Sequence, residues 1–112
     1  MPRRKVPHPV AAAIGARVRV LRKERGLSLG KLAAASAVPK GSLSSLERGL
    51  VLIRLPTAVA IARGLEVDPA QLFTFPEEGE IEKVVDLLYR LPEASAREVI
   101  AKVERARRGL DG

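Results

Sequence analysis

The chain has 112 residues, which is enough for one domain or for a small domain with an appendage. It contains no cysteine and a single histidine, His8, so disulfides, thiolate metal ligands, a cysteine nucleophile and a multi-histidine metal site are excluded. Twenty Lys and Arg residues against thirteen Asp and Glu residues give a formal net charge of +7, and only 3% of the residues are aromatic. This composition argues against an enzyme and favours a module that binds duplex DNA, and we expect no cofactor.

The positive charge is concentrated in the first part of the chain. Residues 1–25 carry eight positive and one negative side chains, whereas residues 77–112 carry seven positive and nine negative ones. The composition changes at Phe75-Pro76-Glu77-Glu78-Gly79. We therefore predict a basic flexible arm over residues 1–9, a helical domain over 10–76 and a C-terminal helical extension over 77–112.

The sequence also bears on the cellular compartment. No segment approaches the roughly 20 continuous apolar residues that a membrane span requires. The apolar run at residues 10–14 imitates part of a signal peptide, but charge returns at Arg17 and Arg19, which such a segment would not carry. We expect a cytoplasmic protein.

The spacing of apolar residues predicts an all-α fold. Ile14, Val18 and Leu21 recur at helical spacing, and no alternating run of strand length occurs. Gly and Pro residues, together with capping residues, mark the ends of the elements. The predicted helices up to residue 76 are one from about Ala11 to Gly26, one after Ser28, one between Pro39 and Gly49, one from about Pro56, and a short one after Asp68-Pro69 with Leu72 and Phe73.

Two further helices are predicted in the extension. The first has acidic residues at its N-terminal end, which suits the helix dipole, and carries the apolar residues Ile81, Val84, Val85 and Leu88. The second begins at Pro92 or at Ser95, where Ser95-x-x-Glu98 has the pattern of a capping box, and ends at residues 107–109.

The second and third helices are joined by a tight connection, and five short helices in about 60 residues are typical of a helix-turn-helix domain. Leu32, Val38, Leu43 and Leu46 are predicted to form the core wedge between these two helices, and Ala33 is small enough for their close approach.

From Ile14 to Phe73 the chain resembles the XRE-type helix-turn-helix proteins, which share the lambda-repressor-like fold of phage repressors and Cro. The resemblance rests on several landmarks in register. They are Ile14-Gly15-Ala16-Arg17-Val18, Leu21-Arg22, Gly26-Leu27-Ser28, Leu32-Ala33, Ser44-x-Leu46-Glu47-Arg48-Gly49, Ala62 and Leu65-Glu66-Val67-Asp68-Pro69.

The resemblance implies that the third helix lies in the major groove of double-stranded DNA, with its outward N-terminal residues at base edges. Lys40 suits guanine and Ser44 suits several bases, but this reading surface contains no Arg, Gln or Asn, so we expect phosphate contacts to supply much of the affinity. The implied DNA-binding residues are Lys40, Gly41, Ser42, Ser44, Ser45, Ser28, Lys31, Arg17 and Arg54. Arg3, Arg4 and Lys5 form either an arm that grips the DNA or a disordered tail that raises solubility.

The resemblance also implies a structural ion pair between Arg22 and Glu47, which ties the third helix to the first. The chain departs from the family at three places. Leu29 stands where a Gln is usual, Pro39 stands where a Ser or Thr cap is usual, and the apolar loop Leu50, Val51, Leu52 and Ile53 stands where the family is basic and polar. We expect this loop to be buried against the extension or to contact another protein.

The extension is too short to form a stable core alone, so we expect it to dock on the domain or on a partner subunit. Helix-turn-helix proteins generally read two half-sites about 34 Å apart as dimers. The predicted dimer or partner contacts are Leu50, Val51, Leu52, Ile53, Val84, Val85, Leu88, Val99, Ile100 and Val103.

Two functions remain open at this point. The first is a sequence-specific transcriptional regulator, a small homodimeric repressor that binds double-stranded DNA. The second is a protein-interaction adaptor on the same fold, antitoxin-like or coactivator-like, which the apolar loop, Leu29 and the sparse reading face favour. The sequence offers no paired acids, metal-ligand spacing or phosphate-binding glycines for an enzyme.

Overall fold

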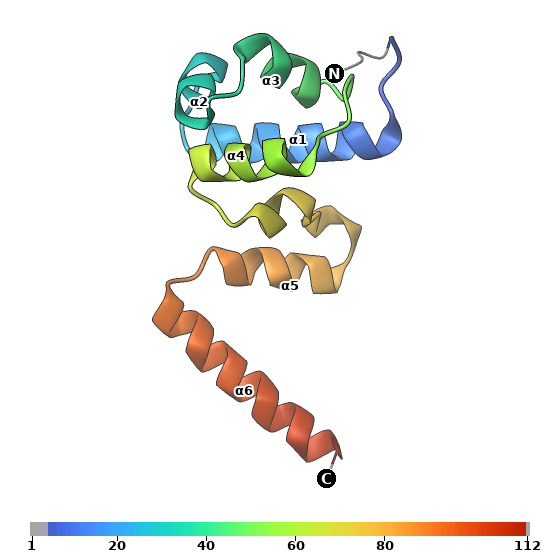
Figure 1. Ribbon diagram of the computed structural model, residues 1–112. Helices are drawn as coiled ribbons and strands as arrows, with labels where there is room; N and C mark the ends of the chain where they lie inside the picture. The colour runs from blue at the N-terminus through green and yellow to red at the C-terminus, as the bar shows by residue number, and fades with distance from the viewer. Residues whose placement is uncertain (1–4, 112) are drawn as a thin grey trace. The chain divides into compact units, whose positions relative to one another are not determined.

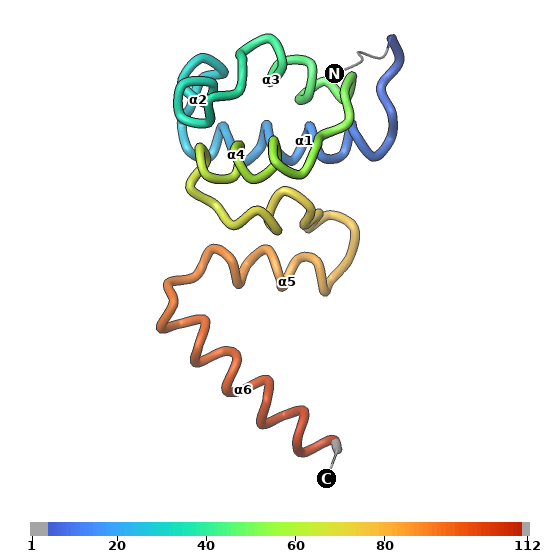
Figure 2. Tube along the Cα trace, in the orientation of Figure 1, coloured from blue at the N-terminus to red at the C-terminus, as the bar shows by residue number. Residues whose placement is uncertain are grey.

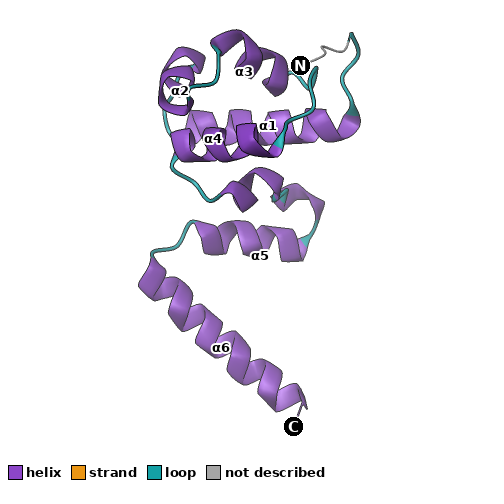
Figure 3. Cartoon of the chain, viewed as in Figure 1, coloured by secondary structure: helices purple, strands orange, loops and turns teal. Residues whose placement is uncertain are grey.

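The computed structural model describes residues 5–111. Within this range every regular element is a helix and no strand occurs (Figure 3), so the predicted all-α class is confirmed. The chain divides between Phe75 and Pro76 into two compact units, which we call the N-terminal unit and the C-terminal unit. This division lies one residue before the boundary that the composition predicts.

Figure 1 shows the order of the elements. The N-terminal unit contains α1 (Pro9–Glu24), α2 (Leu29–Ser36), α3 (Lys40–Glu47), α4 (Leu55–Leu65) and the 3-10 helix η1 (Pro69–Phe73). The C-terminal unit contains the 3-10 helix η2 (Pro76–Glu78), α5 (Glu80–Tyr89) and α6 (Glu93–Asp111). None of the helices in residues 5–111 combines the length and apolar character needed to cross a membrane.

Side-chain caps set where several helices begin. The Ser28 hydroxyl accepts a hydrogen bond from the Lys31 amide at 3.1 Å, and Asp68 caps η1 in the same way. The Nδ1 atom of His8 accepts a bond from the Val10 amide at 3.2 Å, so α1 begins at Pro9 and the last residue of the predicted arm belongs to a helix. Arg3 and Arg4 of that arm lie outside the described residues.

Of the two predicted starts of the last helix, the one at Pro92 is confirmed to within one residue and the capping box at Ser95 is wrong. The last helix begins at Glu93, so Ser95 lies inside its first turn rather than before it. Pro92 decides the start, because its carbonyl accepts the first helical hydrogen bond, from the Ala96 amide at 3.0 Å. The helix also continues through Gly109 to Asp111, since a single exposed glycine costs a helix only about 1 kcal/mol and does not end it.

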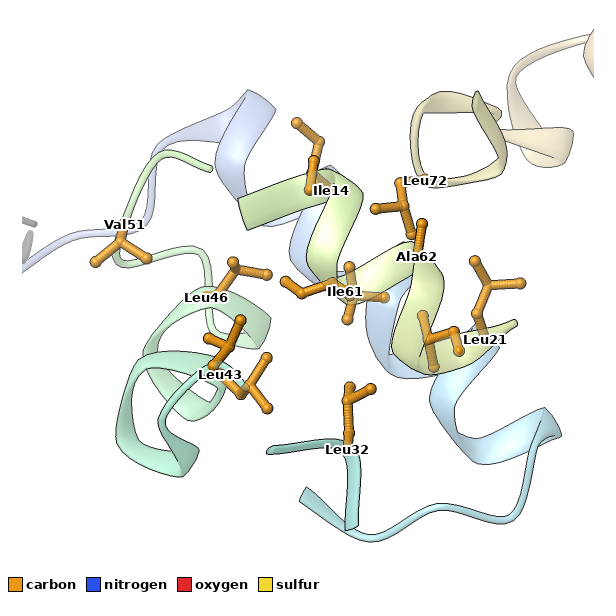
Figure 4. Packing of buried hydrophobic residues seen from close by; sticks show 13 residues of the cluster. Ile14, Leu21, Leu32, Leu43, Leu46, Val51, Ile61, Ala62 and Leu72 are labelled. Atoms are coloured by element: carbon orange, nitrogen blue, oxygen red, sulfur yellow. The ribbon is translucent and has the colours of Figure 1, made fainter. Parts of the chain in front are cut away.

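The core of the N-terminal unit is built by α1 to α4 and η1 (Figure 4). Val18, Leu32, Leu43, Ile61 and Leu72 are each fully buried. The predicted wedge is confirmed, because Leu32, Val38, Leu43 and Leu46 are all buried and belong to this cluster. The wedge holds α2 against α3, while α2 also packs on α4, and α1 packs on α3.

Two glycines allow the backbones of α1 and α3 to approach closely. A Cβ atom at Gly15 would meet the carbonyl oxygens of Leu46 and Glu47, the latter at 2.9 Å. Gly49 follows α3 with a φ of +74°, and a Cβ there would meet the backbone of Ala12 at 2.7 Å. Because backbone atoms cannot yield as a side chain does, these contacts fix the position of α3 on α1.

Candidate nucleic-acid interface

The connection between α2 and α3 is a three-residue turn, which Figure 2 shows as a tight bend of the chain. Ala37 adopts the left-handed conformation at φ 60°, which ends α2. The Ser36 hydroxyl donates to the Leu32 carbonyl at 2.7 Å and accepts from the Val38 amide at 3.3 Å. This side chain therefore satisfies polar backbone groups on both sides of the bend, and the turn directs α3 to the surface of the unit.

Helix α3 has one structural face and one outward face. Leu43, Ser45 and Leu46 are buried against the rest of the unit. Lys40 and Gly41 are exposed and Ser44 is partly exposed. Because side chains spaced by three to four residues share a face of a helix, the outward residues form one strip with a basic group at its N-terminal end.

Arg22 and Glu47 form a bidentate ion pair, and this is the pair that the family resemblance implies. Nε of Arg22 donates to one carboxylate oxygen of Glu47 at 2.7 Å, and Nη2 donates to the other at 3.0 Å. The third nitrogen, Nη1, donates to the Leu27 carbonyl at 2.8 Å. The two side chains are only 11% and 7% exposed. The pair therefore fixes the C-terminal end of α3 to α1 and leaves Glu47 turned away from the outward strip.

The hydrogen bonds from Arg22 to Glu47 raise the pKa of the guanidinium, against an opposing effect of burial. A raised pKa contributes stability that is fully present below the unfolded-state pKa and is lost only as the pH rises through the folded-state pKa, far above neutrality. Arg22 therefore stays protonated throughout the neutral range, and its half of the pair does not titrate there.

Two of the residues predicted to bind DNA are instead internal. Arg17 is only 6% exposed, and its Nε donates to the Gln71 carbonyl at 2.9 Å, so it joins α1 to η1 and does not present its charge to a phosphate. Ser45 is 8% exposed and lies on the structural face of α3. The prediction that these two side chains contact DNA is corrected, because both are buried within the N-terminal unit.

The other residues predicted to contact DNA have accessible side chains in the N-terminal unit. Lys31 is exposed in the first turn of α2, Arg54 is exposed directly before α4, and Ser42 is partly exposed beside Lys40. Ser28 is exposed, with its oxygen engaged in capping α2.

Arg48 is a further candidate beyond the residues predicted from the sequence. It is exposed directly after α3 and donates from Nε to the Ser44 carbonyl at 3.3 Å. Its position four residues after Ser44 and eight after Lys40 is the signal that would have placed it on the outward strip.

The apolar departures from the family are explained by the core of the N-terminal unit. Leu29 and Ile53 pack against the core cluster, and Val51 belongs to it with 5% exposure. Leu50 is partly buried, and only Leu52 is strongly exposed, at 53%. The expectation that this loop packs on the extension or forms a protein contact is therefore wrong for Val51 and Ile53, because the loop closes the domain's own core.

The predicted contact residues of the C-terminal unit are accessible to different degrees. Val84, Ile100 and Val103 are exposed, whereas Val85, Leu88 and Val99 are partly exposed. Within residues 76–110 only Asp86 is buried, and it pairs with Arg90 at 3.0 Å. The apolar side chains of α5 and α6 are thus available for contacts beyond those within the unit.

A family model described as a helix-turn-helix domain matches residues 13–73, which is more than half of the chain. The chain belongs to this helix-turn-helix family. The matched segment contains α2, the turn and α3, together with most of α1 and all of α4 and η1. Its end at Phe73 leaves the C-terminal unit outside the family match.

Two solved structures show the same fold. The restriction-modification controller protein C.AhdI from Aeromonas hydrophila is 30% identical, with a TM-score of 0.58, and the match covers 59% of this chain and 100% of that protein. The controller protein C.Esp1396I is 23% identical, with a TM-score of 0.55, and the match covers 59% of this chain and 86% of that protein. Among curated proteins, none matches this sequence.

Proposed function

We propose that this helix-turn-helix protein is a sequence-specific transcriptional regulator, a small homodimeric repressor that places α3 in the major groove of double-stranded DNA. The observation that carries the proposal is the division of α3 into two faces. Leu43, Ser45, Leu46 and Glu47 hold the helix to the rest of the unit, whereas the side chains of the outward strip are exposed or partly exposed. The likeness to restriction-modification controller proteins supports a regulatory role.

The chemistry of the strip suggests how the contacts divide. Lys40 is the residue of α3 that we assign to a base edge, since a lysine ammonium donates well to the O6 and N7 atoms of guanine. Gly41 and Ser44 are small, so they admit a close approach of the groove floor, and Ser42 is assigned to the edge of the same surface. We assign Ser28, Lys31, Arg48 and Arg54 to the phosphates on either side.

The adaptor alternative loses its main support from the fold. Leu29, Val51 and Ile53, which favoured a protein contact, pack within the N-terminal unit. The proposal also assigns no catalytic role, and within residues 5–111 no group of three or more His, Cys, Asp and Glu side chains is placed to hold a metal ion. A regulator of this kind would act in the cytoplasm, on the DNA of the cell.

The test is titration of a labelled random-sequence duplex by fluorescence anisotropy at two salt concentrations, followed by selection and sequencing of the bound DNA. We expect a two-fold symmetric motif and an association constant that falls steeply with salt. The logarithm of that constant should change by about −0.9 per phosphate contact for each unit in the logarithm of salt concentration. A slope near zero, or binding that enriches no sequence, would contradict the proposal.

Two variants assign the contacts. Lys40→Ala should weaken binding to the selected site more than tenfold and relax the preference at one base of each half-site, because a good base contact contributes about 1–3 kcal/mol. Lys31→Ala should weaken binding to all sequences alike and reduce the salt slope by about 2 in a dimer. Lys83→Ala is the matched control, since Lys83 is an exposed lysine on α5 of the other unit. It should change neither quantity.

A further inference from the structure

Helix α6 is exposed over almost its whole length. It runs for 19 residues, and every residue from Ile100 to Leu110 is exposed. Helices in proteins gain most of their stability by packing an apolar face rather than from the helix propensity of their residues. The apolar side chains Ile100, Val103 and Leu110 are nevertheless 50%, 61% and 89% exposed.

The apolar residues of α6 follow the spacing of a coiled-coil seam. Ala96, Val99, Val103, Ala106 and Leu110 are separated by three, four, three and four residues, which places them along one line of the helix. Ile100 lies beside this line. A seam of this pattern is complementary to a second helix with the same spacing, and the identical helix of another copy of the chain has it.

The charges of α6 favour an antiparallel arrangement of the two copies. Its second half carries Lys102, Arg105, Arg107 and Arg108 against Glu104 and Asp111, whereas its first half carries Glu93 and Glu98 against Arg97. A parallel pair would bring the two basic halves together. An antiparallel pair places each basic half beside the less basic half of the other copy, which lowers the repulsion.

We propose that α6 is a self-association surface, on which the α6 helices of two copies of the chain pack antiparallel along this seam. The register that aligns the seam places Val99 opposite Val103 of the second copy, and Ala96 opposite Ala106. The flanking positions then bring Glu93 beside Arg107 of the second copy and the two Ile100 side chains together at the two-fold axis. The two Lys102 side chains lie on the other flank of the axis, where their length lets the charged ends reach solvent.

This surface refines the homodimer of the proposed function and can be tested without DNA. The seam is two heptads long, so the contact belongs to the small, reversible class of interfaces, and a palindromic site would add to it by binding both N-terminal units. Because the family match ends at Phe73, the seam is an addition to the family's domain.

The first experiment is sedimentation equilibrium of the full chain over a wide concentration range. We expect a reversible monomer–dimer equilibrium. Val103→Glu should raise the dissociation constant at least tenfold, because it places a carboxylate in the seam. Ala101→Glu adds the same charge on the opposite side of the exposed helix and should leave the constant within about twofold. A protein that is monomeric at every concentration, or a dimer that Val103→Glu leaves intact, would overturn the proposal.

The second experiment tests the orientation. Glu93→Arg and Arg107→Glu should each weaken the dimer, and the double variant should restore it, because both pairs are reversed together. The chain has no cysteine, so single cysteines report proximity directly. A mixture of Ala96→Cys and Ala106→Cys chains should form the mixed disulfide. Ala106→Cys alone should not form its own disulfide, and efficient formation of that disulfide would indicate a parallel pair and overturn the register.

The outcomes separate the two proposals. An unaltered chain that stays monomeric at every concentration but still binds a single half-site would refute the seam and leave the DNA-binding function standing. A dimer that binds no DNA at either salt concentration would leave the seam standing and refute the DNA-binding function. The thermal unfolding of each variant, followed by circular dichroism, checks that the N-terminal unit remains folded.

Discussion

The two units of this chain bury apolar surface in opposite ways. In the N-terminal unit the apolar faces of α1 to α4 meet in one cluster, and Leu32, Leu43 and Ile61 are completely inaccessible. Among the described residues of the C-terminal unit no hydrophobic side chain is buried, and Ile81 and Val103 are more than half exposed. The same helical periodicity therefore produces a core where several helices surround it, and an accessible stripe where they do not.

The two units therefore differ in the apolar contacts that can stabilise them. The N-terminal unit supplies its own apolar contacts, so substitutions in it should change the free energy of unfolding. The C-terminal unit lacks such contacts, so equivalent substitutions there should change association and leave the unfolding of the N-terminal unit unaltered.

The largest effect is expected from breaking the buried ion pair. Glu47→Ala should lower the free energy of unfolding by about 3 kcal/mol, because it leaves the Arg22 guanidinium buried without its counter-charge. Urea denaturation measures the loss. Glu66→Ala is the control, since Glu66 lies 3.9 Å from Arg25 in an exposed pair and should change stability by less than 1 kcal/mol. Equal losses for the two variants would refute the structural role assigned to Glu47.

A matched pair of leucine truncations tests the contrast between the units directly. Leu43→Ala should cost about 3 kcal/mol, because Leu43 is fully buried and the truncation leaves a cavity in the core. Leu110→Ala removes the same atoms from a side chain that is 89% exposed and should cost less than about 0.5 kcal/mol in dilute protein. Thermal and urea unfolding at low concentration compare them, and similar costs would show that the units are not distinct.

Two glycine substitutions test the close approach of α1 and α3. Gly15→Ala should destabilise the N-terminal unit by about 2 kcal/mol, because the added methyl group meets the backbone carbonyls at the end of α3. Gly41→Ala meets no atom within 4 Å and should be neutral or stabilising by about 0.5–1 kcal/mol, since alanine favours the helix. Urea unfolding curves of the two variants measure these changes. A free energy of unfolding that Gly15→Ala leaves unchanged would contradict the close approach of α1 and α3.

The smallest effect concerns the turn between α2 and α3. Ala37→Gly should stabilise the domain by about 0.5–1 kcal/mol, because glycine adopts the left-handed conformation without the steric cost that alanine bears there. Ala35→Gly, two residues earlier and inside α2, should instead destabilise by about 1 kcal/mol. Urea titration should therefore show changes of opposite sign in the free energy of unfolding of the two variants. A loss of stability in both would contradict the left-handed conformation of Ala37.

The sequence predicts the elements that local chemistry controls. Ser28 and Asp68 mark helix starts because their side chains bind the first amides, and Leu32 and Leu43 are recognised as core because they recur at helical spacing. The capping motif at Ser95 predicts the wrong start, because a side chain that can cap a helix does not require a helix to begin there. The helix begins earlier, with its first hydrogen bond to the Pro92 carbonyl.

The remaining errors come from contacts between distant residues. The family resemblance implies a DNA contact for Arg17. Its place between Ile14 and Val18 instead puts it on the buried face of α1, where the Gln71 carbonyl accepts its hydrogen bond. Val51 lies in an irregular loop, where no periodicity indicates which side chains turn inward. The charge or apolarity of a side chain indicates the kind of partner that it needs. Which residue becomes that partner depends on contacts between distant parts of the chain.

The two-faced character of α3 has a consequence for how such a protein changes its target. Anchoring by Leu43, Leu46 and Glu47 is independent of the residues at positions 40, 41, 44 and 48. Those four positions can be randomised together in a library without altering the scaffold. A lineage could therefore move from one operator to another in single steps, each folded, and an engineer could follow the same route.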